Sequence, residues 1–171
     1  PAGWWSRGGG ARRWATARPT CGSSGCRALA DRPGWLERGR KSASGWRVTD
    51  RAAQMALGGD GNIAQEDEDG WDMAVFAAST HVSPPERAAF RAIVDAGFSD
   101  VARAFTPGPG VYTYWDYTQL SFPKRHGMRI DFVLGSPAFS SRVVGASIDR
   151  EERKGKGASD HAPVIVELAD L

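Results

Sequence analysis

The stretch GMRIDFVLGS, residues 127–136, constrains the fold more than any other part of the chain. Its Ile, Phe, Val and Leu side chains predict a strand, in the middle of which Asp131 should be half buried. A buried carboxylate without a partner has a raised pKa and destabilises the fold. We therefore expect Asp131 to have a partner, which is a histidine, an arginine or a metal ion, and a purely structural pair with Arg129 is the alternative.

Segments of strand and helix character alternate along residues 54–171. SPPERAAFRAIVDAGF starts with Ser83, followed by two prolines and by Glu86, which predicts a helix with a capping box that ends at Gly97. Further strands are expected at residues 54–59, 110–117, 143–151 and 161–168, and a short helix at 136–142. Strands interleaved with helices predict an α/β fold with a partly antiparallel sheet.

Residues 1–53 differ in composition from the rest. The first fifty positions hold five of the seven Trp and nine Gly. They carry nine Arg and one Lys against three acids, a net charge of +7, which leaves −5 for the remainder because the whole chain has +2. We expect a basic low-complexity segment, either disordered or translated out of frame, in front of a folded domain at residues 54–171.

Composition excludes several classes of protein. Two Cys are too few for a disulfide framework, and no His or Cys pair completes a zinc site with them. No apolar run approaches membrane-spanning length, and the start lacks the apolar region of a signal peptide. We expect no membrane association and, by default, a cytoplasmic location. The net charge of residues 51–171 does not by itself predict a nucleic-acid binder.

Polar side chains that could take part in catalysis or binding lie at the ends of predicted strands or within them. Asp60 and Asn62 lie two positions apart in a glycine-rich turn, where ordinary turn formation is the alternative explanation. Asp131 interrupts the apolar strand described above. Asp160 and His161 directly precede the apolar run VIV, and neighbouring side chains of an extended segment point to opposite faces. A surface pair is the alternative for these two residues.

This set of acids, amide and imidazole predicts metal-assisted phosphoryl chemistry. Oxygen ligands suit Mg²⁺ or Mn²⁺ rather than zinc. The divalent ion would neutralise phosphate charge, an Asp would prepare a water nucleophile, and His161 would stabilise the pentacoordinate oxygen. The acidic run at residues 66–69 is expected to be a solvated loop and is not counted as part of the site.

The motifs GDGNIAQEDED, TYWDY, GMRIDFVL and SDHAPVIVEL occur in an order that resembles the exonuclease III family of DNA-repair nucleases. That family is part of the endonuclease/exonuclease/phosphatase superfamily. The resemblance covers about residues 55–168. It implies part of a four-layer α/β sandwich of two facing sheets, with the N-terminal half missing or replaced, so that this chain builds about one sheet with its covering helices.

The resemblance also implies roles for the candidate residues. Asp60 would position or deprotonate the attacking water, and Asn62 would hold the scissile phosphate. Asp131 would orient the catalytic histidine or assist the leaving group. Asp160 would serve the histidine or a metal ion, and His161 would bind the phosphate oxygen and, with Asp160, a metal ion. These five residues are therefore the expected catalytic and metal-binding set.

Two further groups match positions that contact DNA in the family. The residues expected to form or support an apolar pocket for a flipped-out abasic sugar are Tyr114, Trp115, Met128 and Ile130, with core packing as the alternative. The residues expected to meet backbone phosphates are Lys124, Arg125, Arg153, Lys154 and Lys156, with a solvated basic loop as the alternative.

Departures from the family pattern limit the expected activity. Gly61 stands where the family usually has a bulky aromatic residue, and Thr118 stands where an arginine is common. The Asn, Glu and Tyr that early strands of the family supply, including the main metal carboxylate, have no counterpart in residues 1–53.

The expected function is a monomeric, Mg²⁺- or Mn²⁺-dependent DNA-repair nuclease that acts on double-stranded DNA. It would have 3′–5′ exonuclease and abasic-site endonuclease activity, impaired in this chain. Two alternatives stay open. One is an inactive remnant or basic-tailed DNA-binding fragment, and the other is a superfamily phosphatase that acts on a small phosphorylated substrate.

Overall fold

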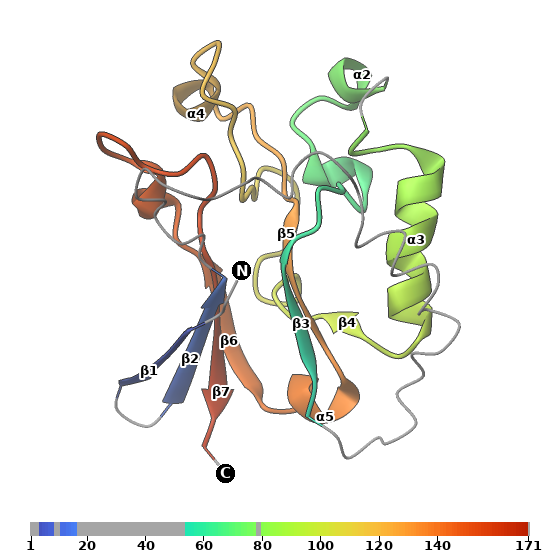
Figure 1. The fold of residues 1–171 in the computed structure, drawn as a ribbon, viewed down its shortest axis with the longest axis vertical. Coiled ribbons are helices and arrows are strands. Elements are labelled where there is room, and N and C mark those ends of the chain that lie inside the picture. The colour runs from blue at the N-terminus through green and yellow to red at the C-terminus, as the bar shows by residue number, and fades with distance from the viewer. Residues whose placement is uncertain (1–3, 9–10, 17–53, 78–79, 171) are drawn as a thin grey trace, which may run out of the picture.

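Two antiparallel sheets form the framework of the chain in the computed structural model, which describes residues 4–8, 11–16, 54–77 and 80–170. The first sheet has the strand order β3-β5-β4, and the second has the order β1-β2-β7-β6 (Figure 1). The strands are β1 (Trp4–Gly8), β2 (Ala11–Thr16), β3 (Ala56–Asp60), β4 (Ser99–Asp100), β5 (Asp131–Gly135), β6 (Val143–Ile148) and β7 (Val164–Ala169).

One long helix and several single turns complete the described part of the chain. The helix α3 (Pro84–Asp95) lies on the side of the first sheet that faces away from β6 and β7 (Figure 1). The short helices are α2 (Met73–Phe76), α4 (Ser121–Lys124) and α5 (Pro137–Ser140), and the 3₁₀ turns are η2 (Asp67–Asp69) and η3 (Arg150–Arg153). None of the helices among the described residues has the length and apolar character needed to cross a bilayer.

The capping box expected at the start of α3 is confirmed. The Ser83 hydroxyl donates to Glu86 Oε2 at 2.5 Å, and the Ser83 backbone N–H donates to the same oxygen at 3.3 Å. Two prolines fill the first turn, where their missing N–H groups cost nothing. The helix ends at Asp95, and Gly97 follows with a φ of 106°, a conformation that glycine adopts without strain.

β5 is buried on both faces because each face packs against a different layer. All five of its residues are buried. Phe132 and Leu134 pack with Phe90 of α3, whereas Val133 packs with Val164 and other apolar residues of β7. The layers therefore follow the order helix, first sheet, second sheet (Figure 1), in agreement with part of a four-layer sandwich.

Two expectations about the sheets are corrected. The chain was expected to build about one sheet, but the described residues form two, because β6 and β7 pair with each other and not with β5, and β1 and β2 extend their sheet. Residues 110–117 were expected to be a strand, yet they contribute only isolated bridges from Tyr114 to Met128 and to His161. Residues 1–3, 9–10 and 17–53 lie outside the described residues, and the disorder or out-of-frame origin expected for residues 1–53 stays a prediction.

The acidic run at residues 66–69 is not simply a solvated loop. Asp69 is fully buried, and Arg129 Nε donates to its Oδ1 at 2.7 Å. Arg129 Nη1 also donates to Asp100 Oδ2 at 2.5 Å, and Arg103 contacts Asp69 as well. Burial alone would lower the pKa of Arg129, but the charges of Asp100 and Asp69 raise it, so the guanidinium stays ionised.

We expect Asp69→Ala to lower the free energy of unfolding by about 3–5 kcal/mol, because it leaves the buried cation of Arg129 with one carboxylate instead of two. The matched control is Asp67→Ala in the same turn. Asp67 is 77% exposed and pairs with Arg87 at 2.8 Å, so its loss should cost no more than about 1 kcal/mol. Urea denaturation of both variants measures the difference, and equal losses would show that the buried network does not stabilise the fold.

Candidate active site

Three of the predicted site residues meet where the two sheets come together. Asp60 ends β3 and lies opposite Asp131, which begins β5. His161 lies three positions before β7 and is thereby attached to the second sheet. One oxygen of each carboxylate and one ring nitrogen of His161 all lie within 4.8 Å of one another. The backbone geometry thus gathers residues that are up to 101 positions apart in the sequence.

A hydrogen bond between Asp131 and His161 forms the centre of this cluster. His161 Nδ1 lies 2.8 Å from Asp131 Oδ2, and both side chains are 9% exposed. His161 Nε2 lies 3.8 Å from Asp60 Oδ2. The partner expected for Asp131 is therefore a histidine, and Arg129 belongs to the separate network with Asp69 and Asp100.

Burial raises the pKa of Asp131, although its hydrogen bond and charge interaction with His161 act in the opposite direction. The negative charge of Asp60 adds to the increase, and a hydrogen bond from the Thr113 hydroxyl reduces it. The fold therefore holds a carboxyl group in surroundings that are unfavourable for its charge. Such an arrangement is common where a carboxylate has to act chemically.

Thr113 supports the site and was not found by sequence reasoning. Its side chain is fully buried. Its Oγ1 accepts the backbone N–H groups of Ile130 at 3.0 Å and of Asp131 at 3.1 Å. The hydroxyl thus binds both the backbone and the carboxyl group of Asp131. The available signal was a small hydroxyl residue within the aromatic run VYTYW.

Asn62 follows Asp60 in a tight turn. Its backbone N–H donates to Asp60 Oδ1 at 2.9 Å, and its φ of 51° lies in the left-handed region that asparagine tolerates. Gly61 between them donates to Ile130 O at 2.7 Å. A Cβ at Gly61 would lie 3.2 Å from both that oxygen and the Phe132 ring, so the small residue suits this close approach.

Asp160 lies next to the cluster without being one of its three members. Its backbone oxygen accepts the Trp115 N–H at 3.0 Å. Its charge acts on Tyr114, whose pKa is raised to about 12 by burial and by the negative charges of Asp116 and Asp160. The Tyr114 ring also lies 5.0 Å from the His161 ring. The role of Asp160 as a metal ligand stays a prediction.

The expected DNA-contacting residues divide by burial. Trp115, Met128 and Ile130 are core residues with exposed fractions of 2%, 2% and 1%. They can support a pocket from behind, while Tyr114 is partly exposed beside His161. Lys124 and Arg125 are exposed at the end of α4. Their contacts with DNA stay predictions.

The donor set suits a hard cation only in part. The carboxylate oxygens of Asp60 and Asp131 are ligands of the kind that Mg²⁺ and Mn²⁺ prefer. The imidazole of His161 is less suitable, because its Nδ1 already contacts Asp131 and because Mg²⁺ favours oxygen. Among the three groups, the carboxylate oxygens of Asp60 and Asp131 therefore suit a hard cation better than the imidazole does.

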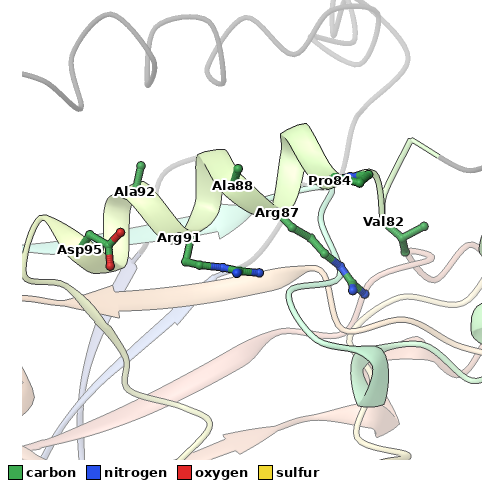
Figure 2. Close-up of a pocket in the computed structure, with 7 residues that line it drawn as sticks. All are labelled: Val82, Pro84, Arg87, Ala88, Arg91, Ala92 and Asp95. Carbon is green, nitrogen blue, oxygen red and sulfur yellow. The ribbon is translucent and has the colours of Figure 1, made fainter.

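A separate hollow of about 520 Å³ lies along α3 (Figure 2). Its described lining consists of Val82, Pro84, Arg87, Ala88, Arg91, Ala92 and Asp95. None of these residues belongs to the cluster of Asp60, Asp131 and His161. We therefore do not assign this hollow to the chemistry.

We expect Asp131→Asn to be more stable than the unchanged protein near neutral pH, because the substitution removes a buried charge. A raised pKa in the folded state means that stability falls as pH rises through that pKa. The two proteins should differ least below the ordinary carboxyl pKa and should diverge as the pH rises. Urea denaturation from acid to neutral pH measures this difference.

Asp116→Asn is the control of opposite sign. Hydrogen bonds from the hydroxyl and the backbone N–H of Thr118 lower the pKa of Asp116, so folding favours its charged form. Relative to the unchanged protein, this variant should be a little less stable above the ordinary carboxyl pKa, and the difference should disappear as the pH falls through the lowered pKa of Asp116. If both variants respond to pH with the same sign, the assignment of a costly charge to Asp131 is wrong.

Comparison with known proteins agrees with this geometry. Residues 4–161 match the Endonuclease/Exonuclease/phosphatase family. The chain is 29% identical over 121 residues to the DNA repair nuclease APEX1 of Danio rerio, which is 70% of this chain and 38% of that protein. It is 30% identical over 116 residues to an exodeoxyribonuclease of Bacillus subtilis, which is 67% of this chain and 44% of that protein. The chain spans less than half the length of these curated relatives.

A solved structure gives the same picture. The structure of the 3′ phosphatase NExo from Neisseria, bound to a product DNA hairpin, superimposes with a TM-score of 0.71 and 31% identity. The superposition covers 80% of this chain and 52% of that one. The family match extends over most of the chain, and the fold agrees with it. This chain therefore belongs to the endonuclease/exonuclease/phosphatase family.

Proposed function

We propose that Asp60, Asn62, Asp131 and His161 form the phosphate-cleaving part of an exonuclease III-type DNA-repair nuclease. The observation that carries this proposal is the 2.8 Å contact between Asp131 and His161, with Asp60 beside the second ring nitrogen. A carboxylate that orients an imidazole, next to a second carboxylate, can both move a proton and stabilise charge on a phosphate.

Each side chain has a defined part in the proposed hydrolysis. Asp60 accepts a proton from the water whose oxygen attacks phosphorus, the bond from phosphorus to the leaving oxygen breaks, and the leaving oxygen takes up a proton from solvent. His161, oriented through Nδ1 by Asp131, donates from Nε2 to a phosphate oxygen as charge develops on it. The Asn62 amide holds the same phosphate from the adjoining turn. Bound Mg²⁺ or Mn²⁺ would supply neutralisation of the phosphate charge.

Double-stranded DNA is the proposed substrate. The relatives carry the names of a DNA repair nuclease and an exodeoxyribonuclease, and the structure of NExo contains a DNA hairpin. Tyr114 lies beside His161 with an exposed edge, which suits an abasic sugar turned out of the duplex. A monomer in the cytoplasm, with 3′–5′ exonuclease and abasic-site endonuclease activity, completes the proposal.

A DNA end that carries a 3′-phosphate is a second candidate substrate. The Neisseria protein that superimposes on this chain is described as a 3′ phosphatase. The same water attack on phosphorus would release phosphate instead of a nucleotide. Release of phosphate from a duplex with a 3′-phosphate end, measured beside cleavage of an abasic duplex, tests this candidate.

We expect this chain to cleave abasic duplex DNA at least 100-fold more slowly than the exodeoxyribonuclease of Bacillus subtilis under the same conditions with Mg²⁺. The reason is that the chain corresponds to 44% of that protein, and the family resemblance assigns the main metal carboxylate to another segment. Initial rates at equal enzyme concentration measure the ratio. Equal rates would show that the described cluster is sufficient.

We expect His161→Gln to reduce the remaining cleavage by about 100-fold or more, as for other groups that stabilise a developing oxyanion. The same substitution at His126, which is stacked on Trp71 at a ring distance of 3.7 Å, is the matched control and should change the rate little. Thermal denaturation checks that both variants fold, and EDTA should stop the reaction. Cleavage that survives His161→Gln would contradict the proposed site.

A further inference from the structure

The side chain of Tyr114 contacts the candidate active site with its ring and a carboxylate with its hydroxyl. Its ring centre lies 5.0 Å from that of His161, and an isolated bridge pairs the backbones of the same two residues. Its hydroxyl donates to Asp116 Oδ2 at 3.3 Å. Asp116, which has no part in the reacting cluster, is thereby placed one side chain away from the histidine of that cluster.

The carboxylate of Asp116 is held in one orientation although it is exposed. The hydroxyl and the backbone N–H of Thr118 donate to its Oδ1 at 2.5 Å and 2.6 Å. These hydrogen bonds lower the pKa of Asp116, so that the group is ionised at neutral pH. Among the described residues, Oδ2 accepts only the long contact from Tyr114. Because a carboxylate oxygen has two lone pairs, Oδ2 has room for a donor from outside.

The hydroxyl of Tyr114 keeps its proton and can donate it to a ligand. Burial raises the pKa of Tyr114 to about 12, and the negative charges of Asp116, Asp160 and Asp60 add to the increase. The contact of this hydroxyl with Asp116 is longer than the usual O–H···O distance of about 2.7–2.8 Å. A ligand that makes shorter hydrogen bonds to both groups can therefore replace this contact at little cost.

One acceptor next to one donor selects a hydroxyl group as the ligand. A hydroxyl carries a donor and an acceptor on the same atom, whereas an amino group or an ammonium ion offers donors only. A phosphate group would meet a like charge on Asp116. A hydroxyl between the two side chains donates to Asp116 Oδ2 and accepts from Tyr114. The ring form of an abasic deoxyribose has such a hydroxyl at C1′, where an intact nucleotide has its base.

We propose that Asp116 and Tyr114 bind the C1′ hydroxyl of an abasic deoxyribose whose phosphodiester is placed at His161. This inference rests on the proposed nuclease function and adds to it a polar contact beside the apolar residues Met128 and Ile130, against which Tyr114 packs. The pair thus acts on specificity and not on the bond that breaks. Its consequence is that the chain distinguishes a natural abasic site from a sugar ring without the hydroxyl.

The test compares the affinity of the full chain for three fluorescent duplexes in EDTA, where no cleavage occurs. One duplex has a natural abasic site, one has a tetrahydrofuran residue that lacks the C1′ hydroxyl, and one is intact. The unchanged protein should bind the natural abasic duplex about 10-fold more tightly than the tetrahydrofuran duplex, the lower end of what a hydrogen bond to a charged group contributes. Tyr114→Phe and Asp116→Asn should each reduce this ratio to roughly 3 or less, because each variant weakens or removes one of the two hydrogen bonds.

Two matched controls remove the same groups at other positions. Tyr117→Phe removes a phenol hydroxyl that donates to Ala158 O at 2.9 Å. Asp72→Asn removes a carboxylate that accepts the backbone N–H two residues later, that of Ala74 at 2.9 Å, as Asp116 also does. Both controls should keep the ratio of the unchanged protein, and thermal denaturation checks that all four variants fold.

Equal affinities of the unchanged protein for the two abasic duplexes, or a ratio that survives in either Tyr114→Phe or Asp116→Asn, would overturn the inference. Initial cleavage rates on the same duplexes with Mg²⁺ separate this failure from failure of the proposed function. If both abasic duplexes are cleaved at equal rates and His161→Gln removes the cleavage, only the hydroxyl contact is wrong. If the unchanged protein neither cleaves abasic DNA nor binds it more tightly than intact DNA, the nuclease proposal fails as well.

Discussion

The packing of β5 between two layers is the constraint on which the rest of the structure depends. A strand that is buried on both faces must be apolar on both, and this one satisfies the condition except at Asp131. Its start is anchored from outside the strand, because Arg129 is bound by Asp69 and Asp100. The same anchor fixes the residue that carries the carboxylate of the site. Fold stability and site geometry therefore share one element.

The sequence was sufficient to predict a helix or strand where the residues that stabilise it are close together in the chain. The helix α3 could be predicted because Ser83 and Glu86 form its cap within one turn, and β5 and β7 because each contains a short run of apolar residues. Residues 110–117 alternate like a strand, but Thr113 and Tyr114 both donate to the same oxygen of Met128, so no regular ladder forms. The alternation of apolar and polar residues indicates which face of a segment is apolar, but it does not indicate which backbone groups form hydrogen bonds.

Burial of charge was the least predictable property. Asp69 stands in a run of acids whose other members are exposed, and nothing near it in the sequence shows that Arg129, sixty positions away, removes it from water. The second sheet was not predicted because nothing in the sequence shows that β7 pairs with β6 and β2 rather than with β5. Pairing between segments that are far apart in the chain produces no recognisable residue pattern in either segment.

The candidate site was predictable in its main residues and not in its supports. Asp60, Asp131 and His161 could be proposed because each lies within or next to an apolar strand and because their motifs resemble those of a known family. Thr113 gave no such sign, since a threonine is ordinary in a strand-like segment, and its importance comes only from the oxygen that binds Asp131. Metal ligation by Asp160 is a different case, because neither its position in the sequence nor its contacts decide it.

The short contact between Asp131 and His161 joins one sheet to the other, since each residue is attached to a different one. Sliding of one sheet over the other by a fraction of an ångström would lengthen this contact while both apolar cores stayed dry. The alignment of these two side chains is therefore more sensitive to the relative position of the sheets than the packing of either apolar core is.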